Sequence, residues 1–99
     1  MTILDLQKNA KVLSPKSKDK SPEQRMLYLM TEVGETALEV LKLQGFRNPE
    51  ATEDLKQKFG MEIFDVVWNL CDLANMYDLD LEKAFKQKIA INKVRDAER

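Results

Sequence analysis

The segment Met61–Tyr77, with the sequence MEIFDVVWNLCDLANMY, constrains the fold more than any other part of the chain. When it is plotted as a helix at about 100° per residue, its apolar side chains cover well over half of the circumference. An ordinary surface helix has a narrower apolar stripe, so this pattern predicts a helix that other protein surrounds on most sides. The remaining face is one narrow polar column of Glu62, Asp65, Asn69 and Asp72.

The whole chain is predicted to be all-α. It contains three glycines and three prolines, and no segment alternates between apolar and polar residues as a strand does. We expect four helices, over about 2–12, 22–44, 49–77 and 81–97. Gly60 lies inside the third range, which suggests that another helix packs closely there.

Start and stop signals support these boundaries. Ser21 can cap the second helix, the proline after it suits the first helical position, and Gln24 completes a capping box. Asn48 repeats the start signal before the third helix, and Asp80 can cap the fourth. Gly45 is expected to end the second helix.

Length and charge limit the domain organisation. The 99 residues suffice for one domain, 1–99, whose core we expect at 22–95. The preceding basic segment, 8–20, carries five lysines against one aspartate. It is either a solvated linker or an arm that closes over an anionic ligand. A chain of this size has a modest core, and oligomerisation is the usual way to enlarge it.

Composition also limits location and partners. The net charge of −1 argues against a dedicated nucleic-acid-binding protein. No apolar run is long enough for a membrane span, and Met1–Ala10 lacks the apolar segment of a signal peptide. The single cysteine, Cys71, suits a reducing compartment. We therefore expect a cytoplasmic protein that binds neither membrane nor nucleic-acid polymer.

The chain has no histidine, which limits its chemistry. A zinc site is improbable with one cysteine and no histidine, and histidine-based acid–base or nucleophilic schemes are excluded. Any metal must be held mainly by oxygen, which points to Mg²⁺, Mn²⁺ or Ca²⁺.

The second helix carries acidic residues on one face. Glu32 and Glu35 share that face with Tyr28 and Glu39, and no lysine within the helix compensates Glu32 or Glu35. The opposite face is apolar and comprises Met30, Val33, Ala37, Val40 and Leu41. Taken alone, this pattern fits an ordinary amphipathic helix with a solvated acidic face.

Two such helices together favour a metal site. Glu32 and Glu35 are three residues apart, as are Glu62 and Asp65, and an antiparallel hairpin can bring the two pairs face to face. Four carboxylates in partial burial cannot all stay ionised without a counter-charge. Mg²⁺ supplies that charge and keeps open positions for substrate phosphates. Asn69, one turn beyond Asp65, can point into the same cavity.

The fourth helix contributes a further polar set. Lys88, Asn92 and Arg95 fall on one face. This face is either simply solvated, or it binds phosphate through the basic residues and hydrogen-bonds a base through the asparagine.

At these residues the sequence resembles the all-α nucleotide pyrophosphohydrolases, the MazG-like proteins and their dCTPase and dimeric dUTPase relatives. The segment 29–35, LMTEVGE, is similar to the family's EExxE segment, and 62–68, EIFDVVW, to its ExxD segment. Lys88, Asn92 and Arg95 match a closing K-x-x-x-N-x-x-R pattern. The resemblance covers about 22–95, with Thr31 in place of the first glutamate.

The resemblance implies a four-helix protomer that assembles into a homodimer or homotetramer, with active sites near subunit interfaces. It implies cleavage of the α–β phosphoanhydride of (deoxy)nucleoside triphosphates, as in nucleotide-pool house-cleaning. It implies Mg²⁺, or Mn²⁺, held by Glu32, Glu35, Glu62 and Asp65, which would also be the catalytic residues.

Two other interpretations remain open. The chain could be a non-catalytic helical dimer whose acidic column binds a basic partner. It could also be a related hydrolase that acts on phosphoribosyl-ATP.

Overall fold

The structure is a computed structural model that describes residues 1–13, 21–45 and 49–98. Four helices account for most of these residues: α1 (Ile3–Leu13), α2 (Pro22–Gly45), α3 (Pro49–Met76) and α4 (Leu81–Ala97). The all-α prediction is confirmed for the described ranges, and each boundary lies within one or two residues of the expected one. Asn48 and most of the basic segment, 14–20, lie outside the described residues.

Local hydrogen bonds explain where the helices begin. The Ser21 amide donates to Gln24 Oε1 at 3.0 Å, and the Gln24 amide donates to Ser21 Oγ at 3.2 Å, which is the expected capping box. The Lys83 amide donates to Asp80 Oδ1 at 3.1 Å, so Asp80 caps α4 as predicted. These contacts satisfy N–H groups that the first helical turn leaves without partners.

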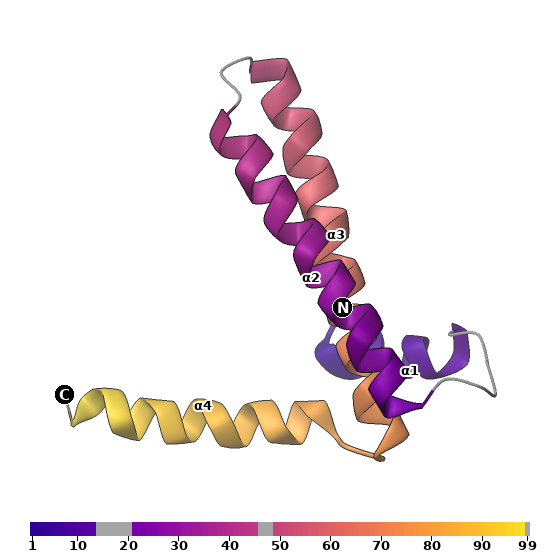
Figure 1. Cartoon of the computed structure of the whole chain (residues 1–99). Coiled ribbons are helices and arrows are strands. Elements are labelled where there is room, and N and C mark those ends of the chain that lie inside the picture. The colour runs from indigo at the N-terminus through magenta and orange to yellow at the C-terminus, as the bar shows by residue number, and fades with distance from the viewer. Residues whose placement is uncertain (14–20, 46–48, 99) are drawn as a thin grey trace.

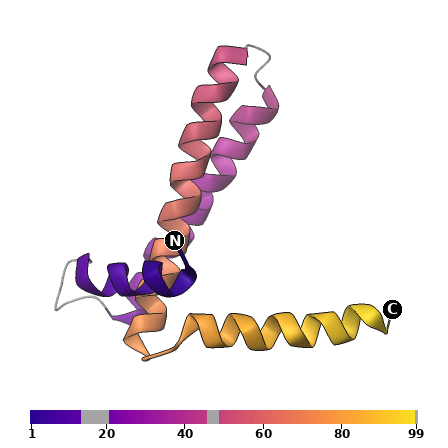
Figure 2. The same cartoon turned by 180° about the vertical axis from the view of Figure 1, so that it is seen from behind.

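Helices α2 and α3 form an antiparallel hairpin, and α1 and α4 are the two further helices attached to it. Helices α2 and α3 lie side by side along their length (Figure 1). Helix α1 packs against the C-terminal part of α3, while α4 packs against α1 and runs away from the hairpin in both views (Figure 2). The four helices of one chain therefore do not close into a bundle.

Gln7, inside α1, connects this helix to the end of α3 and the beginning of α4. Its Nε2 donates to Asn75 Oδ1 at 3.1 Å and to the Leu79 carbonyl, and its Oε1 accepts from the Leu81 amide at 3.1 Å. The Asn75 Nδ2 donates back to the Gln7 carbonyl at 3.1 Å. Buried polar groups cost free energy unless they are paired, so this network fixes the turn from which α4 departs.

The hairpin buries polar side chains and exposes apolar ones. On α2 the buried side chains include Arg25, Glu32 and Glu39, whereas Met30 and Val33 are exposed. The buried hydrophobic residues among the described ones are Ala10, Leu29, Leu55, Cys71 and Ala74. The acidic face of α2 thus meets α3, and the apolar face that would normally form a core points outward.

Helix α3 is not surrounded within one chain. Ile63 and Phe64 remain 43% and 48% exposed, so this chain does not supply the neighbours that the apolar circumference demands. The suggestion of close packing at Gly60 is wrong for the described residues, because a Cβ added there would meet no atom within 4 Å. Gly60 faces open space within one chain.

The chain is extended for its size. Its radius of gyration is 16.7 Å, whereas a compact chain of this length has about 13 Å. It exposes 7772 Å², whereas a folded monomer of this mass exposes about 5800 Å². In the described ranges, none of the helices has both the length and the apolar character needed to cross a membrane.

Candidate metal centre

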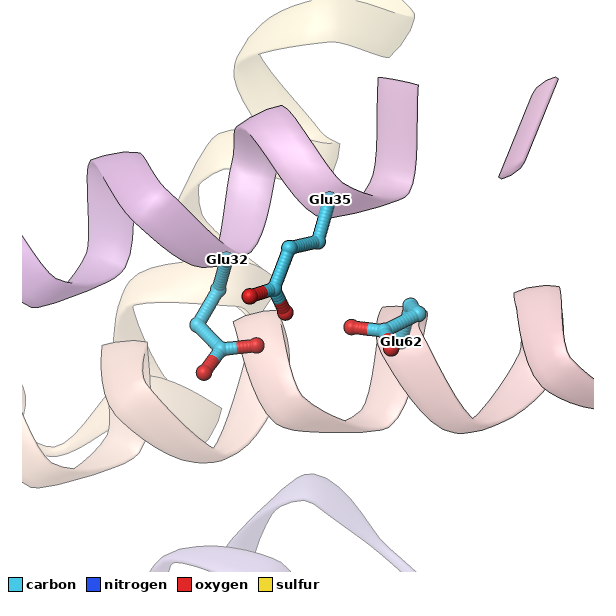
Figure 3. A group of neighbouring side chains, drawn as sticks. All are labelled: Glu32, Glu35 and Glu62. Atoms are coloured by element: carbon cyan, nitrogen blue, oxygen red, sulfur yellow. The ribbon is translucent and has the colours of Figure 1, made fainter. Parts of the chain in front are cut away.

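Three glutamates converge between α2 and α3. Glu32 and Glu35, one turn apart on α2, approach Glu62 of α3, and one oxygen from each lies within 4.8 Å of the other two (Figure 3). Ligands on opposite sides of an ion bound at 2.0–2.1 Å are about 4.2 Å apart. Small side-chain movements would therefore bring the three oxygens onto one cation.

The burial of the carboxylate oxygens of Glu32 and Glu62 is also consistent with a bound cation. Glu32 is only 7% exposed, and Oε2 of Glu32 and Oε2 of Glu62 are buried without a hydrogen-bond partner. A buried carboxylate oxygen without a donor costs free energy. A hard divalent ion would supply the missing interaction to both oxygens.

Burial and mutual repulsion act on the two inner carboxyl groups. Loss of solvent raises the pKa of Glu32, and the charges of Glu35 and Asp65 raise it further, against the opposing hydrogen bond from the Tyr28 hydroxyl. Loss of solvent also raises the pKa of Glu62, with contributions from Glu35, Asp65 and Glu32. Both pKa shifts are in the direction that stabilises the protonated form, as burial and neighbouring negative charges do for a carboxyl group.

Asp65 lies beside the three glutamates and outside their group. Its charge contributes to the raised pKa of both Glu32 and Glu62, so it is close to them. Its backbone carbonyl accepts a hydrogen bond from Asn69 Nδ2 at 2.8 Å. The structure thus groups three of the four expected carboxylates and places the fourth next to them.

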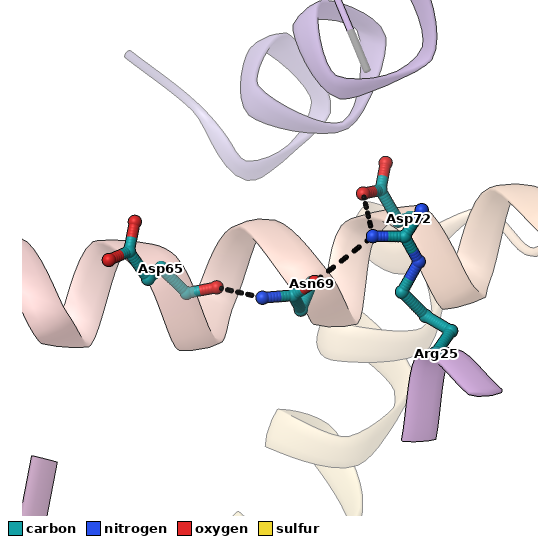
Figure 4. Close-up of polar contacts among 4 residues, drawn as sticks. All are labelled: Arg25, Asp65, Asn69 and Asp72. Carbon is teal, nitrogen blue, oxygen red and sulfur yellow. Dashed lines mark hydrogen bonds and ion pairs between the residues drawn. The ribbon is translucent and has the colours of Figure 1, made fainter. Parts of the chain in front are cut away.

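A buried polar network continues along α3. Arg25 of α2 places NH1 at 3.3 Å from Asn69 Oδ1 and at 3.4 Å from Asp72 Oδ2 (Figure 4). The side chains of Arg25 and Asp72 are 8% and 7% exposed. The guanidinium therefore joins the beginning of α2 to the polar column of α3, two turns from Glu32.

A cavity of about 290 Å³ lies between this network and the glutamates. Arg25, Tyr28 and Glu32 line it from α2, and Asp65 and Asn69 line it from α3. Trp68 and Asp72 complete the lining. A ligand held at the glutamates would have direct access to this space.

The expected residues of α4 are not near the glutamates in one chain. Lys88 and Arg95 are exposed, and Arg95 Nε lies 3.3 Å from Asp96 Oδ1. Asn92 is half-buried, and its Oδ1 is covered without a hydrogen-bond partner. All three residues belong to the helix that runs away from the hairpin (Figure 1).

Sequence reasoning did not include Arg25 in the site. A signal was present, because Arg25 precedes Glu32 by seven residues, which is about two helical turns. That spacing places both side chains on the face of α2 that carries the acidic pair. The positive charge that pairs with Asp72 in the polar column of α3 therefore comes from Arg25 of α2.

Comparison with known proteins supports one family. No protein-family model and no curated protein matches the sequence. The crystal structure of iMazG from Vibrio DAT 722 is similar, with a TM-score of 0.65 and 31% sequence identity. The match covers 94% of this chain and 99% of that one. Together with the four helices and the acidic hairpin, this similarity shows that the chain belongs to the MazG-like family of all-α nucleoside triphosphate pyrophosphohydrolases.

Proposed function

We propose that the protein hydrolyses (deoxy)nucleoside triphosphates to nucleoside monophosphate and pyrophosphate in a Mg²⁺-dependent reaction. One observation carries the proposal. In a MazG-like chain, three glutamates place ligand oxygens within 4.8 Å of one another, and two of these glutamates have a buried oxygen without a hydrogen-bond partner.

Glu32, Glu35, Glu62 and Asp65 would hold the ion, and Mn²⁺ would suit the same oxygen ligands. When bound, the ion would neutralise charge on the triphosphate and promote attack by water. The exposed Glu35 lies on the solvent side of the group, where an incoming substrate and its attacking water would pass.

The neighbouring residues orient this group. The Tyr28 hydroxyl donates to the Glu32 carboxylate, which limits the directions that Glu32 can take. Thr36 Oγ1 donates to the Glu32 carbonyl at 2.9 Å. Asn69 accepts from Arg25 and donates to the Asp65 carbonyl, and it lines the cavity beside the glutamates, where it would contact the substrate.

The α4 residues would act on another copy of the chain. Lys88, Asn92 and Arg95 lie on a helix that leaves its own hairpin, while the hairpin exposes apolar side chains on α2 and α3. Assembly into a homodimer or homotetramer would cover those side chains and bring the α4 of one copy towards the carboxylates of the next. Phosphate would then meet a lysine and an arginine there.

A nucleotide panel assayed for released pyrophosphate tests the proposal. We expect pyrophosphate and monophosphate from at least one nucleoside triphosphate with Mg²⁺ and none after EDTA treatment. Cleavage of phosphoribosyl-ATP alone would instead support the related hydrolase. Absence of turnover on every compound, with Mg²⁺ and Mn²⁺ both tried, would refute the proposed activity and favour a non-catalytic helical dimer.

A further inference from the structure

The face of α2 that packs in the hairpin contains few apolar side chains that could fix how α2 and α3 align. Among the described residues of α2, the buried ones are Arg25, Leu29, Glu32 and Glu39, and only one of these is apolar. Helices normally align through side chains that pack into the grooves of the neighbouring helix. A polar interface of this kind needs a further contact that distinguishes the correct alignment from a shifted one.

The carboxylates of the metal-free protein do not provide that contact. Glu32 and Glu62 approach each other between the helices, and their like charges favour separation. A bound cation needs ligand oxygens placed to within about 0.2 Å, whereas a shift of one helix by one residue moves its side chains by about 1.5 Å along the axis. The candidate metal centre therefore depends on an alignment that its own charges oppose.

The Arg25–Asp72 pair is an attractive contact at the same interface. Arg25 NH1 lies 3.4 Å from Asp72 Oδ2, and the two side chains are 8% and 7% exposed. Separation of a buried ion pair is strongly unfavourable because each charge is left without a partner. Such a pair penalises every alignment that separates it, and setting register is the best-attested role of buried polar groups.

The spacing between this pair and the carboxylates is the same on both helices. Glu32 follows Arg25 by seven residues on α2, and Asp65 precedes Asp72 by seven residues on α3. Because the helices are antiparallel, contact between Arg25 and Asp72 places Glu32 at the level of Asp65. Asn69 extends the contact towards the glutamates, since it accepts from Arg25 NH1 at 3.3 Å and donates to the Asp65 carbonyl at 2.8 Å (Figure 4).

We propose that the Arg25–Asp72 pair sets the register of α2 against α3, and that it thereby holds the carboxylates in place for a divalent cation that it does not touch. Arg25 is thus a positioning residue for the candidate metal centre. The proposal rests on the proposed function only in assuming that the glutamates bind metal. It does not depend on the identity of the nucleotide.

The affinity for Mn²⁺ tests the proposal without any substrate, and electron paramagnetic resonance of the free ion measures it on EDTA-treated protein. The double variant Arg25→Met with Asp72→Leu removes both charges, so the net charge is unchanged and no buried charge is left unpaired. We expect its Mn²⁺ affinity to fall about tenfold or more, while its Tm without metal stays level or rises. A pair that only stabilises the fold predicts a lower Tm and an unchanged Mn²⁺ affinity of the folded protein.

A matched control removes a different ion pair. Lys56 Nζ and Glu53 Oε1 lie 3.4 Å apart on an exposed part of α3, and both belong to one helix, so they cannot set the register of two. Lys56→Met with Glu53→Leu should therefore retain the wild-type Mn²⁺ affinity.

Two further variants restore or preserve the charges of the pair. The exchange Arg25→Asp with Asp72→Arg creates a pair of opposite direction between the helices and should recover most of the lost Mn²⁺ affinity. If the apolar double variant does not fold, Arg25→Lys tests the same point, because it keeps the buried charge but replaces the planar guanidinium by a single nitrogen. It should weaken Mn²⁺ binding by about threefold or more.

Other outcomes would overturn the inference. Wild-type Mn²⁺ affinity in the folded apolar variant or in Arg25→Lys would do so, as would an exchanged variant that folds but binds no better than the apolar one. Pyrophosphate release by a protein whose Mn²⁺ affinity is independent of the pair refutes this inference alone. Mn²⁺ binding that depends on the pair, in a protein that cleaves no nucleotide, refutes the proposed activity alone. A wild type that binds no Mn²⁺ overturns both.

Discussion

Glu32 of α2 and Glu62 of α3 face each other across the helical hairpin, and each has one buried carboxylate oxygen without a hydrogen-bond partner. Two glutamates in this relationship destabilise the hairpin unless they are protonated or share a cation. This relationship underlies the first three predictions.

Mg²⁺ should stabilise the native protein. Because the ion binds the assembled carboxylates and not the unfolded chain, a concentration of 100 times Kd would stabilise the fold by about 2.7 kcal/mol. For a chain of this length that corresponds to roughly 13 °C in Tm. Thermal unfolding of EDTA-treated protein, with and without millimolar Mg²⁺ at matched ionic strength, measures the effect. Superimposable melting curves would rule out the site.

Asp65→Asn and Glu35→Gln should each lower pyrophosphate release by about 100-fold or more, because loss of one ligand weakens metal binding and misplaces the reacting groups. The Tm without metal should stay level or rise, since one repelling charge is removed. Steady-state kinetics and circular dichroism check both points.

Glu53→Gln is the matched control for these two variants, because Glu53 is exposed on α3 and its side chain is 70% accessible. It should leave the rate unchanged. Wild-type turnover in both Asp65→Asn and Glu35→Gln would show that the carboxylates do not hold the catalytic metal.

The stability of the metal-free protein should fall as pH rises above about 4.5. Burial raises the pKa of Glu32 and of Glu62 above their ordinary value of 4.5. Between the ordinary and the raised pKa the folded protein retains protons that the unfolded chain has lost, so deprotonation favours unfolding. The loss of stability is complete once the pH exceeds the raised pKa values of Glu32 and Glu62.

The variant Glu32→Gln isolates the contribution of Glu32 to this pH dependence, because a glutamine side chain has no carboxyl group that can ionise. Tm measured in EDTA from pH 4.5 upward should decline less steeply for the variant than for the wild type. Parallel profiles for the two proteins would contradict the assignment of the pH dependence to Glu32.

The protein should be at least a homodimer in solution. Its surface exceeds that of a compact monomer by roughly 2000 Å², which is more than the about 800 Å² per partner that a stable interface buries. Light scattering at micromolar concentration should give a multiple of 11.5 kDa. A mass near 11.5 kDa would show that the exposed apolar faces are not covered by a second copy.

Mixed oligomers should show whether α4 acts on another subunit. Asn92→Ala alone should raise KM more than it changes Tm. Co-expression of Asn92→Ala with Glu35→Gln should recover part of the activity, because some sites then combine intact carboxylates with an intact α4. Activity of the mixture no higher than the sum of the separate variants would place Asn92 outside the partner's site.

The sequence by itself determined the helices and their boundaries. The capping box of Ser21 and Gln24 and the cap at Asp80 involve residues three apart, so their geometry depends only on the local chain. The i, i+3 spacing of Glu32 and Glu35 likewise places both on one face whatever surrounds them. The expected fold class followed from these local patterns and agrees with the structure.

The tertiary structure decided which faces meet. The sequence allowed an acidic outer face on α2, but the packing turns that face inward against α3 and leaves Met30 and Val33 exposed. It also brought Arg25 to Asp72, residues separated by almost half of the chain, and set Asp65 beside the glutamates rather than among them. These relations depend on the register of two helices, which local signals do not fix. Register depends on the packing of many side chains at once, including the apolar faces that one chain leaves uncovered.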